Sequence, residues 1–82
     1  MYWVYIIRNE KGIYYKGSTS DINNRLIDHN NDKSRYTSGR GPWELVYFKQ
    51  YETKTEALIE ERRLKKLNVL SLERLLNNNS VV

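Results

Sequence analysis

Residues 2–19 read YWVYIIRNEKGIYYKGST. β-Branched and aromatic residues fill Tyr2–Arg8 and Ile13–Thr19, and both runs are typical of strands. The turn-forming residues between them, Asn9-Glu10-Lys11-Gly12, predict that the two strands form a β-hairpin.

Two tyrosines of this hairpin, Tyr5 and Tyr15, are an even number of residues apart. Side chains alternate between the faces of a sheet, so a connecting loop of odd length would place both tyrosines on one face. A three-residue loop with Gly12 in the left-handed conformation is one common choice. A loop of even length would place them on opposite faces. From these residues alone, two ordinary strand tyrosines without a catalytic role are the favoured interpretation.

The rest of the chain predicts a third strand and three helices. A helix capped by Ser20 or Asp21 is expected to end near Asn31, and a polar loop follows at Asp32–Gly41. The third strand is expected at about Trp43–Tyr51. A second helix should run from a capping box at Thr53 and Glu56 to about Leu67, and a short last helix, capped by Ser71, should cover Leu72–Asn77. The order β-β-α-β-α-α predicts an α+β domain, in which helices flank a three-stranded antiparallel sheet.

The length of 82 residues favours a single domain, residues 1–82. The absence of cysteine and the single histidine exclude disulfides, thiolate metal sites and multi-histidine metal sites within one chain. No apolar run approaches the roughly 20 residues that span a bilayer, and the N-terminus lacks signal-peptide features, so we expect a cytoplasmic protein with no membrane partner. Lys and Arg outnumber Asp and Glu by 14 to 10, and this net charge of +4 favours a polyanionic partner such as nucleic acid.

The first predicted helix carries Arg25 and His29 four residues apart, and therefore on one helical face. The planar guanidinium of Arg25 suits phosphate oxygens, although a surface arginine that lies along its own apolar stem is the commoner outcome. A lone histidine is likewise more often a packing or surface residue than a catalyst.

The second predicted helix carries a carboxylate on its apolar side. Steps of about 100° per residue put Glu61 in the middle of the stripe that Ala57 and Leu64 define, with Glu60 at the margin of the stripe. An unpaired buried carboxylate is costly, so a partner must compensate it. A salt bridge to Arg25 and a bound cation are the two alternatives, and the helix pattern alone favours the salt bridge.

Taken in order, these residues resemble the pattern of the GIY-YIG nucleases. The matching segments are Trp3-Val4-Tyr5 and Tyr15-Lys16-Gly17, followed by Arg25, His29 and Glu61. The likeness is closest to the small stand-alone bacterial members, through YWVYII at residues 2–7, RYTSGRGP at 35–42 and EALIEE at 56–61, and it extends to about Lys66. It implies a metal-dependent endonuclease that hydrolyses nucleic-acid phosphodiester bonds.

The resemblance also implies a catalytic role for each matching residue. Tyr5 and Tyr15 correspond to the paired tyrosines of the family motif, and the sequence does not decide which of them takes a proton from water. Arg25 corresponds to the arginine that stabilises the transition state, His29 to a residue that assists proton transfer, and Glu61 to the single acidic metal ligand. One carboxylate is adequate for Mg²⁺ (or Mn²⁺), which keeps several waters. Positive charge from this metal and from Arg25 is expected to lower the pKa of a neighbouring tyrosine.

The sequence departs from the family pattern at three places, and one further position is left open. Trp3 stands where the family name has glycine, as in many stand-alone members, and Lys16 stands where it has isoleucine. Ser18 stands where relatives in excision repair carry a lysine. Some relatives have an asparagine in the last helix, and both Asn68 and Asn77 are candidates for it.

DNA is favoured over RNA as the expected substrate. The residues expected to hold it are basic side chains in and near the polar loop and one aromatic side chain: Lys16, Lys33, Arg35, Arg40 and Tyr36. Such contacts carry no sequence information, so we expect either weak sequence preference or specificity supplied by a homodimer or a partner protein. The alternatives are a catalytically silent nucleic-acid-binding module of the same fold, and an interaction domain in which Glu61 only pairs with Arg25. The complete set of matching residues favours the nuclease.

Overall fold

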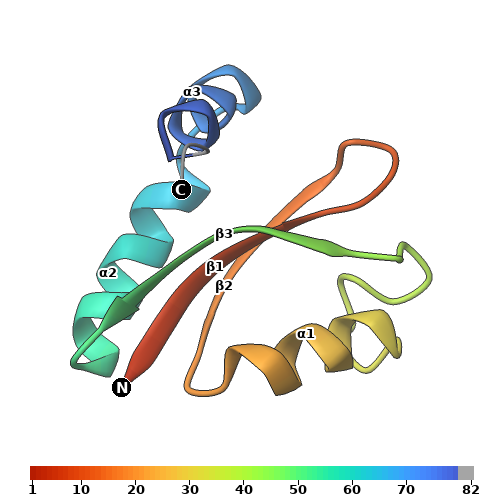
Figure 1. The fold of residues 1–82 in the computed structure, drawn as a ribbon, viewed down its shortest axis with the longest axis horizontal. Helices are drawn as coiled ribbons and strands as arrows, with labels where there is room; N and C mark the ends of the chain where they lie inside the picture. Colours follow the sequence, from red (N-terminus) through yellow and green to blue (C-terminus); the bar gives the residue numbers. More distant parts are fainter. Residues whose placement is uncertain (80–82) are drawn as a thin grey trace.

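The computed structural model of the chain describes residues 1–79. The elements are β1 (Tyr2–Arg8), β2 (Tyr14–Thr19), α1 (Ile22–Asn30), β3 (Glu44–Tyr51), α2 (Lys54–Lys65) and α3 (Val69–Asn79). The strands form one antiparallel sheet in the order β2-β1-β3. α1 lies on one side of this sheet, and α2 and α3 lie on the other (Figure 1). The predicted α+β fold is therefore confirmed.

The hairpin loop determines which side chains share a face of the sheet. Asn9 N donates to Ile13 O at 3.1 Å and closes a three-residue turn that ends with Gly12 at φ +78°. The Asn9 side chain accepts hydrogen bonds from two backbone N–H groups of this turn, at 3.1 and 2.9 Å. Of the two alternatives that the sequence left open, the loop has the odd length. In the resulting register Tyr5 pairs with Gly17 and Ile7 pairs with Tyr15, so both tyrosines project from the α1 face.

The central strand β1 is buried on both faces. Val4, Tyr5, Ile6 and Ile7 are each at most 2% exposed. The even-numbered residues of this group pack against α2 and α3, in a cluster with Ala57, Leu64 and Leu72, whereas the odd-numbered ones pack on the α1 side with Trp43. Burial of each large apolar side chain contributes about 1.5–3 kcal/mol, so β1 is the main source of cohesion between the two layers of helices.

A β-bulge in β3 changes which face of the sheet the β3 side chains project from. Ile6 pairs with Tyr47 but Ile7 pairs with Leu45, which leaves Val46 as an extra residue in β3. As a result Val46 and Tyr47 both pack on the α2 and α3 side, while Leu45 packs on the α1 side.

The ends of the helices agree with the sequence in part. Asp21 caps α1 and the capping box of Thr53 and Glu56 begins α2, as predicted. The prediction for the last helix was wrong, because α3 begins at Val69 and the side chain of Asn68, not that of Ser71, caps it by accepting from Ser71 N at 2.8 Å. Within residues 1–79, no helix has the length and apolar character needed to cross a membrane.

Gly17 lies beneath the ring of Tyr5. A Cβ atom at this position would lie 2.6 Å from Tyr5 Oη and 2.8 Å from Tyr5 Cζ, both closer than real Cβ contacts. We expect Gly17→Ala to lower the free energy of unfolding by about 1–3 kcal/mol, because the buried tyrosine ring must move to relieve the overlap. Urea unfolding measures this loss. The control is Gly41→Ala, whose Cβ would meet its nearest atom at 3.4 Å. Equal losses in the two variants would contradict the prediction.

Candidate active site

Four of the five candidate catalytic residues meet on the α1 face of the sheet. Tyr5 Oη lies 2.8 Å from His29 Nε2. The ring of Tyr15 is centred 6.3 Å from that of Tyr5 and 5.0 Å from that of His29. Arg25 lies one helical turn before His29, and its guanidinium interacts with both tyrosines. The hairpin register and the spacing of the two residues on α1 therefore converge at one place.

The loop between α1 and β3 completes the surroundings of His29. His29 and Thr37 are fully buried, and His29 Nδ1 lies 2.7 Å from Thr37 Oγ1. Trp43 Nε1 donates to Thr37 O at 3.2 Å. Thr37 is not among the site residues expected from the sequence, although it lies inside the RYTSGRGP segment that carries part of the family resemblance.

Burial dominates the electrostatics of the hydrogen-bonded pair. It raises the pKa of Tyr5 to about 12, although hydrogen bonding to Arg25 acts in the opposite direction. Burial also lowers the pKa of His29 to about 4, and the positive charge of Arg25 adds to this effect. Arg25 lowers the pKa of Tyr5, as expected, but burial has the larger effect and the pKa is raised overall.

Glu61 approaches the sheet from the other side. Ser18 Oγ donates to Glu61 Oε1 at 2.6 Å, and Lys65 Nζ lies 2.7 Å from Glu61 Oε2. Ser18 pairs with Val4 and therefore projects from the α2 face of the edge strand β2. The negative charge of Glu61 is a small contribution, after burial, to the raised pKa of Tyr5. The contacts of the carboxylate therefore lie on the α2 face of the sheet, opposite the face that carries the tyrosine cluster.

The predicted salt bridge between Glu61 and Arg25 is wrong. Arg25 Nη1 lies 4.0 Å from Asp28 Oδ2, and Arg25 Nη2 donates to Ser34 Oγ at 3.4 Å. The two residues lie on helices on opposite sides of the sheet, so the periodicity of either helix could not show whether they meet.

The helix pattern also did not separate the two adjacent glutamates of α2. Glu60, expected at the margin of the apolar stripe, has a side chain 14% exposed, against 15% for Glu61. Glu60 Oε2 accepts from Arg63 Nη2 at 2.8 Å, and this bond holds the pKa of Glu60 below its usual value. The two carboxylates differ in their neighbours rather than in their burial.

Two of the expected nucleic-acid contacts join the tyrosine cluster. The rings of Tyr15 and Tyr36 are centred 5.4 Å apart, and the guanidinium of Arg40 lies 4.9 Å from the centre of the Tyr36 ring. Lys33 and Arg35 are exposed on the same loop. Lys16 pairs with Ile6 and therefore projects from the α2 face, away from Tyr15.

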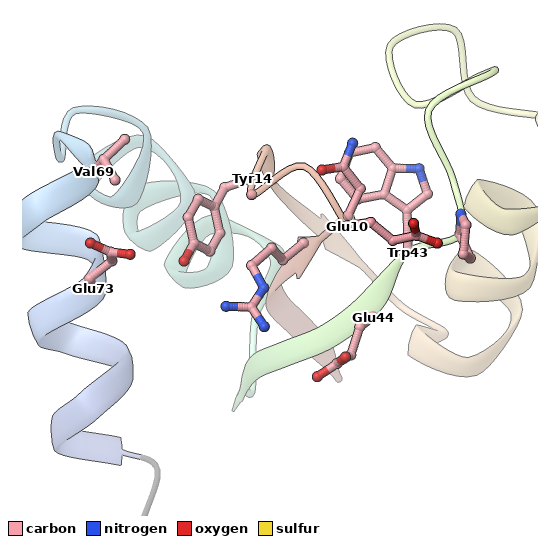
Figure 2. A pocket seen from close by; sticks show the side chains of 10 residues that line it. Glu10, Tyr14, Trp43, Glu44, Val69 and Glu73 are labelled. Atoms are coloured by element: carbon pink, nitrogen blue, oxygen red, sulfur yellow. The ribbon is translucent and has the colours of Figure 1, made fainter.

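A separate cavity of about 430 Å³ lies between the hairpin, the start of β3 and α3. Glu10, Glu44 and Glu73 line it together with Arg8, and Figure 2 shows Glu44 and Glu73 on different elements around the hollow. None of the five candidate catalytic residues, all within residues 1–79, lines this cavity. Three carboxylates against one guanidinium disfavour a phosphate, so this cavity is not part of the candidate site.

The fold and the cluster together define a class of protein. It is a small α+β domain in which paired tyrosines, an arginine and a histidine cover one face of a three-stranded sheet, with a glutamate on a helix beside the edge strand. A family model described as the GIY-YIG catalytic domain matches residues 1–72. The chain belongs to this family.

The chain is also similar to proteins of comparable size. The chain is 46% identical over 65 residues to the UPF0213 protein of Staphylococcus epidermidis, covering 78% of this chain and 79% of that protein. It is 38% identical over 82 residues to the UPF0213 protein of Clostridium perfringens, covering 99% and 88%. The solution NMR structure of the UPF0213 protein from Bacillus halodurans is similar with a TM-score of 0.62 and 35% identity, covering 94% of this chain and 84% of that one.

The buried state of His29 predicts a pH dependence of stability. Its pKa is depressed from 6.5 to about 4 in the folded protein, so unfolding takes up a proton between these values. This contribution to stability is complete above pH 6.5 and is lost as the pH falls through about 4. Between pH 7 and pH 4, we expect the free energy of unfolding of wild type to fall by up to roughly 3 kcal/mol more than that of His29→Gln. Urea unfolding at each pH tests this, and parallel pH profiles would contradict it.

Proposed function

We propose that this protein is a metal-dependent endonuclease that hydrolyses phosphodiester bonds of nucleic acid, with DNA favoured over RNA. The observation that carries the proposal is the 2.8 Å contact between Tyr5 Oη and His29 Nε2, in a cluster with Tyr15 and Arg25. A phenol backed by a proton acceptor and flanked by a guanidinium suits activation of water beside a phosphate. A module that only binds nucleic acid needs no such pair, and the Glu61 carboxylate would repel its ligand.

Arg25 is placed to stabilise the phosphate. Its side chain is 33% exposed, so the guanidinium can meet a substrate while it contacts the tyrosines. It donates to the non-bridging oxygens and offsets the negative charge that grows in the transition state.

Tyr5 receives a proton from the attacking water and passes its own proton to His29. A free phenolate with a pKa of about 12 would cost roughly 7 kcal/mol at pH 7, so proton loss by Tyr5 is coupled to proton gain by His29 Nε2. The bound phosphate diester adds negative charge near His29, which raises the pKa of the imidazole toward the range where it accepts this proton. Tyr15, which is more exposed than Tyr5, orients the water. Tyr5 is favoured over Tyr15 as the base because Tyr5 contacts His29 Nε2.

Glu61 is the proposed holder of the metal ion. Residues 1–79 contain no group of three or more Asp, Glu, His or Cys side chains arranged to hold a metal. A single partly buried carboxylate fits Mg²⁺ (or Mn²⁺), which takes one or two protein carboxylates and completes its shell with water and substrate phosphate. When bound, the metal would neutralise charge on the phosphate and the leaving oxygen.

The loop between α1 and β3 would hold the nucleic-acid backbone. The contact between Arg40 and Tyr36 holds a guanidinium beside the cluster, while Lys33 and Arg35 add charge on the same loop. Lys16 would contact the substrate only if the nucleic-acid backbone passes over the edge strand β2 to the α2 side of the sheet.

A cleavage assay tests the nuclease proposal. Labelled single-stranded, duplex and branched DNA and RNA are incubated with Mg²⁺ or EDTA. We expect cutting that requires the metal, is lost in Glu61→Gln, and falls by about 10²–10⁴-fold in Tyr5→Phe. Glu60→Gln is the matched control, because that carboxylate is equally buried but pairs with Arg63.

Two results would contradict the proposal. Equal loss of cutting in Glu60→Gln and Glu61→Gln would show that Glu61 has no specific role. Absence of cutting on every substrate, with binding retained, would favour the silent nucleic-acid-binding module.

Salt dependence tests the proposed substrate path. In EDTA, we expect Arg40→Gln to reduce the slope of log K against log salt concentration by about 1, because one phosphate contact is lost. Lys49→Gln is the control, because Lys49 also lies over an aromatic ring, that of Tyr51. Lys49 is on β3, which is the edge strand on the other side of β1 from β2. Fluorescence anisotropy measures both. Equal slopes for Arg40→Gln and wild type would remove Arg40 from the path.

A further inference from the structure

The environment of Thr37 is more specific than packing requires. Its side chain is fully buried, and its hydroxyl oxygen lies 2.7 Å from His29 Nδ1 and 3.5 Å from the carbonyl oxygen of Ser34. His29 in turn uses its second ring nitrogen to contact Tyr5. Tyr5, His29, Thr37 and Ser34 therefore form one chain of polar contacts that begins in the candidate site and ends on a backbone carbonyl.

The backbone carbonyl at the end of this chain determines the direction of its hydrogen bonds. A carbonyl oxygen can only accept, so the hydroxyl hydrogen of Thr37 points to Ser34 O and the Thr37 oxygen accepts from His29 Nδ1–H. A neutral imidazole that donates from Nδ1 has a lone pair on Nε2, so the Tyr5 hydroxyl donates to His29 Nε2.

A neutral imidazole has one N–H group, so the contact at one ring nitrogen determines the role of the other. His29 is neutral near pH 7, because burial lowers its pKa to about 4. With both ring nitrogens in contact with oxygen atoms, one nitrogen donates and the other accepts. The contact of Thr37 with Ser34 O assigns the proton to Nδ1, and Nε2 is the acceptor for Tyr5.

We propose that Thr37 is a positioning residue that holds His29 as the Nδ1–H tautomer, with the Nε2 lone pair directed at the hydroxyl of Tyr5. The consequence for cleavage rests on the proposed function. In this tautomer Nε2 accepts the Tyr5 proton as the Tyr5 oxygen takes one from water. In the other tautomer Nε2–H donates to Tyr5, and the transfer has no acceptor.

The backbone around Thr37 is built to hold this hydroxyl in place. Trp43 Nε1 donates to Thr37 O at 3.2 Å. The Asn30 side chain accepts from Trp43 N at 2.6 Å and donates to Trp43 O at 3.2 Å. Since Asn30 follows His29 directly in α1, the helix that carries the imidazole also fixes the loop that carries its partner.

Nitrogen NMR reads the tautomer directly. The chain has one histidine, so protein labelled with ¹⁵N-histidine and freed of any affinity tag gives a single pair of ring nitrogens. At pH 7 we expect a protonated Nδ1 and an unprotonated Nε2 in wild type. A protonated Nε2 in wild type would overturn the proposal without any variant, and without any measurement of cleavage.

Two variants of Thr37 separate the hydroxyl from the shape of the side chain. Thr37→Val keeps the shape and removes the hydroxyl, and we expect it to populate the Nε2–H tautomer. Thr37→Ser keeps the hydroxyl, and we expect it to retain the wild-type spectrum. An unchanged tautomer in a folded Thr37→Val variant would overturn the proposal. If Thr37→Val does not fold, the wild-type and Thr37→Ser spectra still decide it.

Kinetics test the consequence for the reaction. We expect Thr37→Val to lower kcat by about 10²-fold or more with little change in KM, because the wrong tautomer has no lone pair for the Tyr5 proton. Thr37→Ser should restore most of the rate. If Thr37→Val has the altered tautomer but an unchanged kcat, the tautomer of His29 does not affect the rate of cleavage. Absence of cleavage in wild type would instead refute the proposed function, and the NMR result on Thr37 would stand.

Discussion

The hydrogen bond between Tyr5 and His29 is the interaction on which the geometry of the site depends. It joins the central strand β1 to α1 through two buried side chains, and a buried polar group left without a partner costs about 1–3 kcal/mol. Gly17 leaves room for the tyrosine ring on one side, and Thr37 contacts the second nitrogen of the imidazole on the other. The sheet, the helix and the following loop therefore hold the two side chains in one arrangement.

The parts of the structure that follow from local chemistry were predictable from the sequence. Asn9 and Gly12 have the side chain and the backbone freedom that a three-residue hairpin loop requires, and this loop length alone placed Tyr5 and Tyr15 on one face. The capping box of α2 is equally local. The error at α3 has a local cause too, because Asn68 and Ser71 are both good caps and the pattern does not rank them.

The parts that depend on contacts between distant elements were not predictable in the same way. Helix periodicity gives the direction of Glu61 about the axis of α2 but not the side of the sheet on which α2 packs, so its contact with Ser18 was missed. Thr37 escaped for a similar reason, since a threonine in a polar loop carries no sign that it will be buried against an imidazole. The family resemblance supplied the order of the site residues, whereas the structure supplied their neighbours.

The indole of Trp43 makes the loop between α1 and β3 observable without a chemical label. Its ring is buried and its N–H bonds the backbone of Thr37, whereas the other tryptophan, Trp3, lies on β1 near the start of the chain. Tryptophan emission shifts to longer wavelength when the ring meets water. Release of this loop from α1 would therefore change the intrinsic fluorescence of the protein, and a Trp3→Phe background would isolate that signal. The residue that anchors the loop is thus also an optical reporter of whether the loop is in place.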